Sequence, residues 1–305
     1  MRVTLLGPQR RPTVNTVKRS LRLAGPIATI TAGWQEREPA DGELSEQLGA
    51  RDVNLALYRR WLEVQERDQP FAMAERRLRG VLVEVQDLYL LRLDYALRAV
   101  YALQRRSGDD KLRADALAGA VAAVRELDAA HMRRVGEVRG EFHQVWLPHN
   151  RPVIAEHRAA VARLLGQAAA LVVAGGHVGV LADSMHLFNV AASIRSPVIA
   201  WSAGAMALTD RIVLFHDRSP HGLGHPEIYG RGLGVLPHVV ALPHARARLL
   251  LGDAPRMAVF ARRFAPARCL PLEEGTRVDT DSDGTCPPGT RVLAEDGRMT
   301  SLEAA

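Results

Sequence analysis

The chain has 305 residues, 47% of them hydrophobic and 24% charged, which is enough for one large domain or two smaller ones with their own cores. No stretch of about 18 uncharged apolar residues occurs, so we expect no membrane-spanning helix. The net charge of +6 comes from arginines dispersed among acidic residues rather than gathered in one block, and we therefore do not expect nucleic-acid binding.

The first 40 residues predict a strand, a helix and a second strand, at 3–6, 13–23 and 26–31. A unit of this length implies two parallel strands joined by a right-handed crossover. The first apolar run is too short for a signal peptide. Two cysteines, Cys269 and Cys286, do not make a disulfide framework, so we expect a cytoplasmic, reducing environment.

Residues 41–145 predict a helical region. Apolar residues recur at helical spacing from Leu55 to Val100, and few glycines or prolines interrupt them. The segment 107–110 breaks this pattern and carries an N-cap signal for a further helix. We expect three or four helices packed as a hairpin or a small bundle.

From residue 146 onward, strand and helix patterns alternate again. We expect helices at 152–166, 180–194 and near 246–251, strands at 168–173, 197–200, 211–215, 239–240 and 257–260, and short strands after 268.

Together, residues 1–40 and 146–305 predict an α/β domain with three layers around a doubly wound, mostly parallel sheet, and 41–145 form an all-α helical insertion. The site of such a fold lies at the carboxyl ends of its strands. We expect it to be built from segments that end at Gly33, Gly176 and Ala200, with the insertion beside its entrance.

The segment around Ser202 carries the chemistry. An apolar strand runs directly into Trp201-Ser202-Ala203-Gly204, whose small residues permit the sharp strand-to-helix turn of a nucleophile elbow. The usual pattern is Gly-x-Ser-x-Gly, and Ala200 stands in place of its first glycine. The alternative interpretation is an ordinary serine at a helix N-cap.

Gly175 and Gly176 end an earlier apolar strand. Their backbone N–H groups, with that of Ala203, could form an oxyanion hole, although a plain tight turn is an equally good interpretation of the pair alone. His244 follows a short apolar strand and is the candidate base.

The chain has 11 histidines, of which His221 and His225 are four residues apart and could be read as metal ligands. The glycines between them argue against a helix, and no carboxylate-rich partner set is evident. We therefore predict neither a metal site nor a cofactor.

The double glycine, the elbow and three later segments together resemble the S51 peptidases, the group of dipeptidase E and cyanophycinase. The later segments are Gly-Leu-Gly-Val-Leu-Pro at 232–237, Pro243-His244, and Leu-Glu-Glu-Gly-Thr at 272–276. The resemblance covers the α/β regions but not the helical one. It implies a class I glutamine amidotransferase-like, flavodoxin-like fold.

The resemblance also implies roles for individual residues. Ser202 matches the nucleophile and His244 the base. The third member of the triad would be Asp217, as in dipeptidase E, or Glu274, as in cyanophycinase, and we favour Glu274 because its motif matches better. His177 departs from the family, which commonly has Asp or Asn after the double glycine.

Glutamine amidotransferases share this fold but use a cysteine at the elbow, so serine at this position disfavours glutaminase activity. We predict a serine hydrolase that cleaves a peptide or isopeptide amide through an acyl-enzyme. His177, Trp201 and Arg246 are expected to contact the peptide or small amide substrate.

An alternative is a catalytically weak or inactive module whose helical insertion docks a protein partner. A homodimer is also compatible with the sequence.

Overall fold

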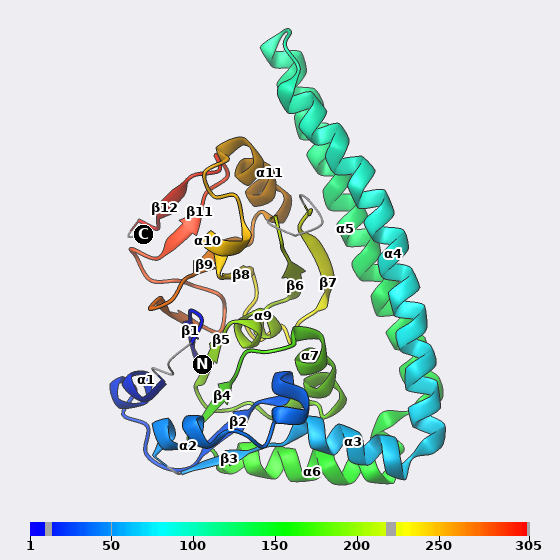
Figure 1. Cartoon of the computed structure of the whole chain (residues 1–305), viewed down its shortest axis with the longest axis vertical. Coiled ribbons are helices and arrows are strands. Elements are labelled where there is room, and N and C mark those ends of the chain that lie inside the picture. Colours follow the sequence, from blue (N-terminus) through cyan, green and yellow to red (C-terminus); the bar gives the residue numbers. More distant parts are fainter. Residues whose placement is uncertain (10–13, 50, 218–223, 304–305) are drawn as a thin grey trace.

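The computed structural model describes residues 1–9, 14–49, 51–217 and 224–303, and it combines an α/β body with a long helical hairpin (Figure 1). The largest sheet has six strands in the order β10-β1-β5-β4-β2-β3, of which five are parallel and β10 is antiparallel to β1. These strands are β1 (Arg2–Leu6), β2 (Ile27–Ile30), β3 (Asp52–Asn54), β4 (Ala170–Val173), β5 (Val198–Trp201) and β10 (Arg277–Asp281).

Helices cover both faces of this sheet. On β4, Val172 packs with one set of helices, whereas Leu171 and Val173 pack with another set on the opposite face. Strands buried on both faces read as continuous apolar runs, which is why the pattern predicted them. One face carries α1 (Val14–Ser20) and α2 (Gly42–Leu48), and the other carries α3 (Leu57–Arg67), α6 (Pro152–Gln167), α7 (Val178–Leu187) and α9 (Ala203–Leu208). The chain is therefore an α/β protein with a mostly parallel sheet.

The C-terminal part differs from the prediction, because of its strands only β10 joins the first sheet, and the others described form two further sheets. A strand is also predicted at 257–260, but these residues lie inside a helix that begins after the N-cap Asp253. A short apolar run alone does not distinguish a strand from a buried helix. The elements are β6 (Arg211–Leu214) paired with β7 (Glu227–Arg231); the sheet of β8 (Val239–Pro243), β9 (Arg268–Leu272), β11 (Arg291–Leu293) and β12 (Met299–Ser301); and the helices α8 (Val190–Ser193), α10 (Ala245–Arg248) and α11 (Ala254–Phe264).

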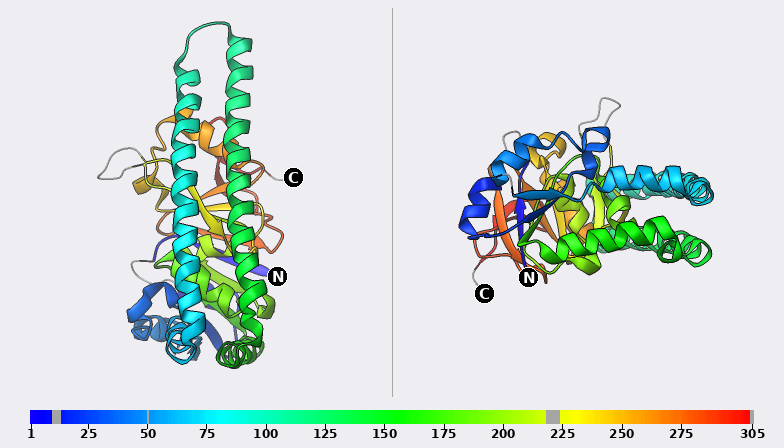
Figure 2. Two further views of the ribbon diagram at one scale, coloured as in Figure 1. Left: turned by 90° about the vertical axis from the view of Figure 1, so that its right-hand side faces the viewer. Right: turned by 90° about the horizontal axis from the view of Figure 1, so that it is seen from below.

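Two antiparallel helices, α4 (Gln69–Arg105) and α5 (Asp110–Trp146), dominate the helical region. Each has 37 residues and is about 55 Å long at the helical rise, so the pair extends well past the body (Figure 2). Asp68 and Asp109 cap them, each accepting a hydrogen bond from the backbone N–H three residues further on. Although both helices are long, no helix of the described ranges is apolar enough over sufficient length to cross a membrane.

The expectation that 41–145 is entirely helical is wrong at one place. Residues 52–54 form β3, which pairs in parallel with β2 and is the edge strand of the main sheet. Ser45 on α2 also donates a hydrogen bond to Asp52 at 2.6 Å. A strand of three residues is too short to show an alternating pattern, and two of its three residues, Asp52 and Asn54, are polar, so the sequence does not reveal it.

A buried polar network fastens the hairpin to the body. Arg263 on α11 forms a two-point ion pair with Asp128 on α5, at 2.6 and 2.7 Å, and both side chains are almost fully buried. The Tyr89 hydroxyl on α4 donates to Asp128 at 2.8 Å and accepts from the Ile228 N–H of β7 at 3.2 Å. Burial, the largest single cause, lowers the pKa of Arg263, but the hydrogen bonds with Asp128 and the negative charge of that carboxylate raise it, and the pKa lies above its ordinary value.

Asp128→Ala should lower the free energy of unfolding by about 3–5 kcal/mol, because it leaves the Arg263 guanidinium buried without its counter-ion. Urea denaturation measures the change. Glu126→Ala, in the same helix and in an exposed pair with Arg133, is the matched control and should cost less than about 1 kcal/mol. Equal losses for the two variants would show that the network does not hold the hairpin.

Candidate active site

Ser202 lies between β5 and α9 with backbone angles φ 50° and ψ −122°. A residue with a side chain rarely adopts this conformation, which costs on the order of 1–3 kcal/mol and persists only where the surroundings enforce it. The sharp turn is the one that the small residues of the segment predicted. Ala200, in place of the usual first glycine, points into the core and is fully buried, so an extra methyl group is accommodated there.

Two glycines make room for this turn. A side chain on Gly204 would collide with the backbone carbonyls of Val173 and Ala174, because α9 packs directly on the end of β4. A side chain on Gly175 would lie 2.9 Å from the Ser202 Cβ. Gly204 and Gly175 are thus both required, because the neighbouring chain comes too close for a side chain at either position.

The loops after β2 and β4 also meet. The His177 N–H donates to the Gly33 carbonyl at 2.7 Å, and Gly176 has φ +117° with its Cα directly against Gly33. The three segments predicted to form the site, which end at Gly33, Gly176 and Ala200, therefore converge at the carboxyl ends of their strands.

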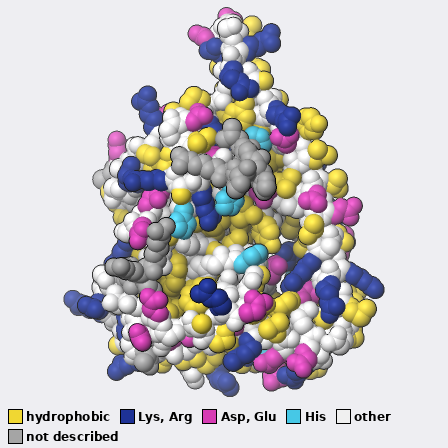
Figure 3. Space-filling view, viewed as in Figure 1, with side chains coloured by type: hydrophobic (Ala, Val, Ile, Leu, Met, Phe, Trp, Pro, Cys, Tyr) yellow, Lys and Arg dark blue, Asp and Glu magenta, His cyan; other side chains and the backbone are white. Residues whose placement is uncertain are grey.

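A cavity of about 810 Å³ opens above the elbow. Figure 3 shows this face of the molecule hollowed, with hydrophobic side chains on the floor of the hollow and histidine and basic side chains around it. The lining residues include the predicted nucleophile, base and oxyanion donors: Ser202, His244, Gly175, Gly176 and Ala203.

His244 follows β8 directly and has left-handed backbone angles, φ 57° and ψ 35°. Its N–H donates to the Leu272 carbonyl at 3.1 Å, and its carbonyl accepts from the backbone N–H groups of the α10 turn. The side chain is half-buried on the wall of the Ser202 cavity. His177 and His216 line the same cavity, so three histidines line the cavity above the elbow.

The two candidates for the third triad position lie in different surroundings. The carboxylate of Asp217 is fully buried, and it accepts hydrogen bonds from Arg256 at 2.6 Å and from the Leu250 N–H at 3.0 Å. Glu274 is exposed and lines a separate cavity with Arg246.

The three predicted substrate contacts are not equally placed. His177 accepts a hydrogen bond from the Val180 N–H and so caps α7, while its ring still lines the cavity. Trp201 also lines it but is only 6% exposed and packs mainly in the core. Arg246 is exposed and lines the Glu274 cavity, whereas its neighbour Arg248 is half-buried on the wall of the Ser202 cavity.

Tyr229 and Gln35 were missed by sequence reasoning. Tyr229 lies on β7 and lines the Ser202 cavity, but nothing in the Gly- and His-rich sequence before it marks a strand. Gln35 follows the carboxyl end of β2, where a site residue is expected, and it has φ 57° and ψ −124°, nearly the angles of Ser202. Its position just after the carboxyl end of a parallel strand was the one sequence signal that could have marked Gln35 as a site residue.

No group of three or more histidine, cysteine or acidic side chains placed to hold a metal ion occurs in the described part of the chain. His221 of the pair considered as ligands lies outside the described residues. His225 stacks on Tyr101 at a ring separation of 5.8 Å and approaches Asp94 at 3.5 Å.

No protein-family model matches the chain, and no curated protein matches it. Among solved structures, it is similar to the crystal structure of a peptidase from an acI-B1 Actinobacterium, with 12% sequence identity and a TM-score of 0.47 over 99% of this chain and 94% of that chain.

Gly204→Ala should destabilise the protein by about 1–3 kcal/mol, because the added methyl group collides with backbone that cannot move aside. Gly80→Ala on α4 is the matched control, since its methyl group meets open space. In a helix interior this control should stabilise by roughly 0.5–1 kcal/mol. Opposite signs in urea denaturation are expected, and stabilisation by both changes would contradict the close packing of α9 on β4.

Proposed function

We propose that this protein is a serine hydrolase of the S51 peptidase type that cleaves a peptide or isopeptide amide bond. The observation that carries the proposal is the strained backbone of Ser202 at a strand-to-helix elbow, in a cavity that His244 and the Gly175-Gly176 turn also line. An ordinary N-cap serine does not need the unfavourable backbone angles of Ser202. Backbone strain is stored preferentially at functional sites.

In the proposed mechanism, the His244 imidazole takes the proton of the Ser202 hydroxyl as Oγ attacks the amide carbonyl. The carbonyl oxygen then carries the negative charge, and the N–H groups of Gly176 and Ala203 are its proposed donors. The C–N bond breaks as His244 returns the proton to the leaving amine. Water, deprotonated in turn by His244, releases the acyl group from Ser202.

Two features support serine rather than cysteine chemistry. Cys269 lies in β9 in the core, where burial raises the pKa of its thiol to about 12, and Cys286 is likewise buried with a raised pKa. Neither cysteine lines the Ser202 cavity. We therefore propose that the protein has a class I glutamine amidotransferase-like fold but no glutaminase activity. Two free, buried thiols also suit the proposed cytoplasmic location.

Ser202→Ala should abolish covalent labelling by a fluorophosphonate probe, because the nucleophile is removed. His244→Ala should slow labelling by at least about 100-fold, since general-base catalysis contributes 10²–10⁴-fold. Labelling is followed by intact-protein mass spectrometry. Ser301→Ala, at an exposed strand position, is the control and should label like the wild type.

An unlabelled but folded wild-type protein would overturn the proposed function. If His216→Ala slows labelling and His244→Ala does not, the serine assignment survives but the base is a different imidazole of the same cavity. His216 is a suitable competitor, since burial and then the Arg248 charge lower its pKa and favour its neutral, proton-accepting form.

Glu274 and Asp217 remain the proposed alternatives for orienting His244. Glu274→Gln should leave the free energy of unfolding unchanged because the side chain is exposed, so a drop in labelling rate would report on orientation alone. Asp217→Asn weakens the pair with Arg256 and should cost a few kcal/mol in unfolding. Labelling rates and urea denaturation, measured on both variants, separate the two candidates. Unchanged labelling in both would exclude a carboxylate at either position.

A second candidate function is a binding module with little or no catalysis. It is favoured by large apolar side chains on the solvent side of the hairpin, namely Val81, Leu88, Leu91, Tyr95 and Leu112, each between 44% and 71% exposed. Such a surface is typical of a protein interface, with a partner or with a second copy. The labelling experiment separates this candidate from the first.

A further inference from the structure

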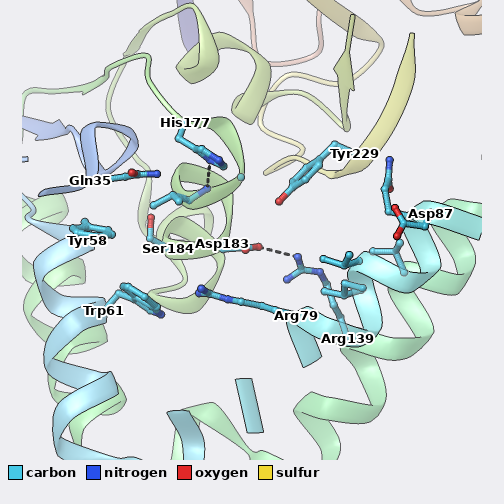
Figure 4. A pocket seen from close by; sticks show the side chains of 16 residues that line it. Gln35, Tyr58, Trp61, Arg79, Asp87, Arg139, His177, Asp183, Ser184 and Tyr229 are labelled. Atoms are coloured by element: carbon cyan, nitrogen blue, oxygen red, sulfur yellow. Dashed lines mark hydrogen bonds and ion pairs between the residues drawn. The ribbon is translucent and has the colours of Figure 1, made fainter. Parts of the chain in front are cut away.

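A second cavity, of about 460 Å³, lies between the hairpin and the body (Figure 4). We call it the hairpin pocket. Its walls come from α3, α4, α5, the start of α7, β7 and the turn after β2, so it exists only because the hairpin is docked on the body. The volume lies within the roughly 300–1,000 Å³ that is usual for small-molecule sites.

Most of the wall is apolar or aromatic. Figure 4 shows Trp61 and Tyr58 on one side and Tyr229 entering from above. The apolar remainder of the lining consists of Leu82, Val83, Val135 and Val180. Burial, and then the nearby Asp183 carboxylate, raise the pKa of the Tyr229 hydroxyl, so it remains neutral at ordinary pH.

The charged groups of the hairpin pocket offset one another. Arg139 pairs with Asp183 at 2.8 Å, and both are partly buried. Arg79 contacts Glu75 at 3.4 Å and lies over the Trp61 ring at 4.8 Å. Asp87 adds a further carboxylate at the rim. A net positive site for an acidic group is therefore not formed here.

The hairpin pocket adjoins the Ser202 cavity. His177, Gly179 and Tyr229 line both of them. At this boundary the Tyr229 hydroxyl packs so closely on Gly179 that any larger residue there would displace it. A group bound in the hairpin pocket therefore lies next to the Ser202 cavity, across the boundary that these three residues form.

Gln35 adds a polar group at the same boundary. Its side chain points into the hairpin pocket, and its backbone has the strained angles already noted (Figure 4). The strain is maintained by the following turn, where the Glu38 N–H donates to the Gln35 carbonyl at 2.8 Å, and the buried Glu38 carboxylate accepts the N–H groups of Tyr58 and Arg59 at the start of α3. The second amide of the lining, Gln86, donates to the Ile228 carbonyl at 3.2 Å. The Gln35 amide is suited to a hydrogen bond with a peptide group.

We propose that the hairpin pocket is the specificity pocket for a bulky apolar side chain of the substrate, an inference that rests on the proposed hydrolase function of Ser202. The volume, the aromatic walls and the balanced charges select a neutral aromatic or branched aliphatic group over an acidic one. Gln35 hydrogen bonds the adjoining peptide group. The helical insertion thus supplies substrate selection, and the body supplies the chemistry.

The test measures binding to Ser202→Ala protein, so it does not depend on turnover. N-acetyl-phenylalaninamide, N-acetyl-alaninamide and N-acetyl-aspartamide are titrated by calorimetry. The phenylalanine amide should bind at least about tenfold more tightly than either of the others, the range expected for an apolar pocket. Val83→Arg should abolish this preference, because Val83 lines the pocket yet is 60% exposed and tolerates replacement.

Val81→Arg is the matched control, since Val81 is exposed on the same helix but does not line the pocket. It should keep the preference. Preference for the aspartate amide, no measurable binding of the phenylalanine amide, or equal effects of the two arginine variants would overturn the inference. Fluorophosphonate labelling of Ser202, measured separately, reports on the hydrolase function, so its failure is distinguished from failure of the pocket.

Discussion

The Ser202 cavity and the adjoining hairpin pocket, together called the cleft, depend on buried arginine–aspartate pairs between α11 and its surroundings. Arg256 and Arg263 are seven residues, or two turns, apart and thus share one face of α11. Arg263 binds Asp128 of the hairpin, while Arg256 binds Asp217 and lies over the Tyr101 ring at 5.3 Å. The desolvation of such pairs makes them weak sources of net stability, but breaking one is costly. They therefore serve to dock the hairpin in one position rather than many, and that position creates the hairpin pocket.

The same pairs show where sequence reasoning ends. The elbow and the Gly-Gly turn were predictable because each depends on residues that are neighbours in the sequence. The convergence of the three strand ends was predictable because the carboxyl ends of parallel strands lie at the same edge of a sheet. Asp128 and Arg263 are 135 positions apart, and no local pattern links them. β3 and α11 were missed for a related reason, since three residues show no period and a short apolar run fits either kind of element.

Backbone strain is the second constraint, and Ser202 and Gln35 share one form of it. Ser202 and Gln35 follow two parallel strands of the same sheet and have nearly equal backbone angles. Ser202 is held by α9 packing on β4, and Gln35 by the turn that Glu38 ties to α3. Burial raises the pKa of the Glu38 carboxyl, and its hydrogen bonds to the Tyr58 and Arg59 N–H groups only partly offset this. The Glu38 side chain thus fixes the start of α3, one wall of the hairpin pocket, to the turn after Gln35.

The hairpin pocket and the Ser202 cavity differ in how their arginines are paired. In the hairpin pocket, each arginine has a carboxylate close to it, so an acidic group gains little there. Arg248 lies instead on the wall of the Ser202 cavity and is half-buried. A substrate that satisfies both regions is apolar where it meets the hairpin and polar where it meets the elbow. If the hairpin pocket selects the substrate as proposed, changes to the hairpin alter substrate choice while the strained serine and its supporting glycines stay as they are.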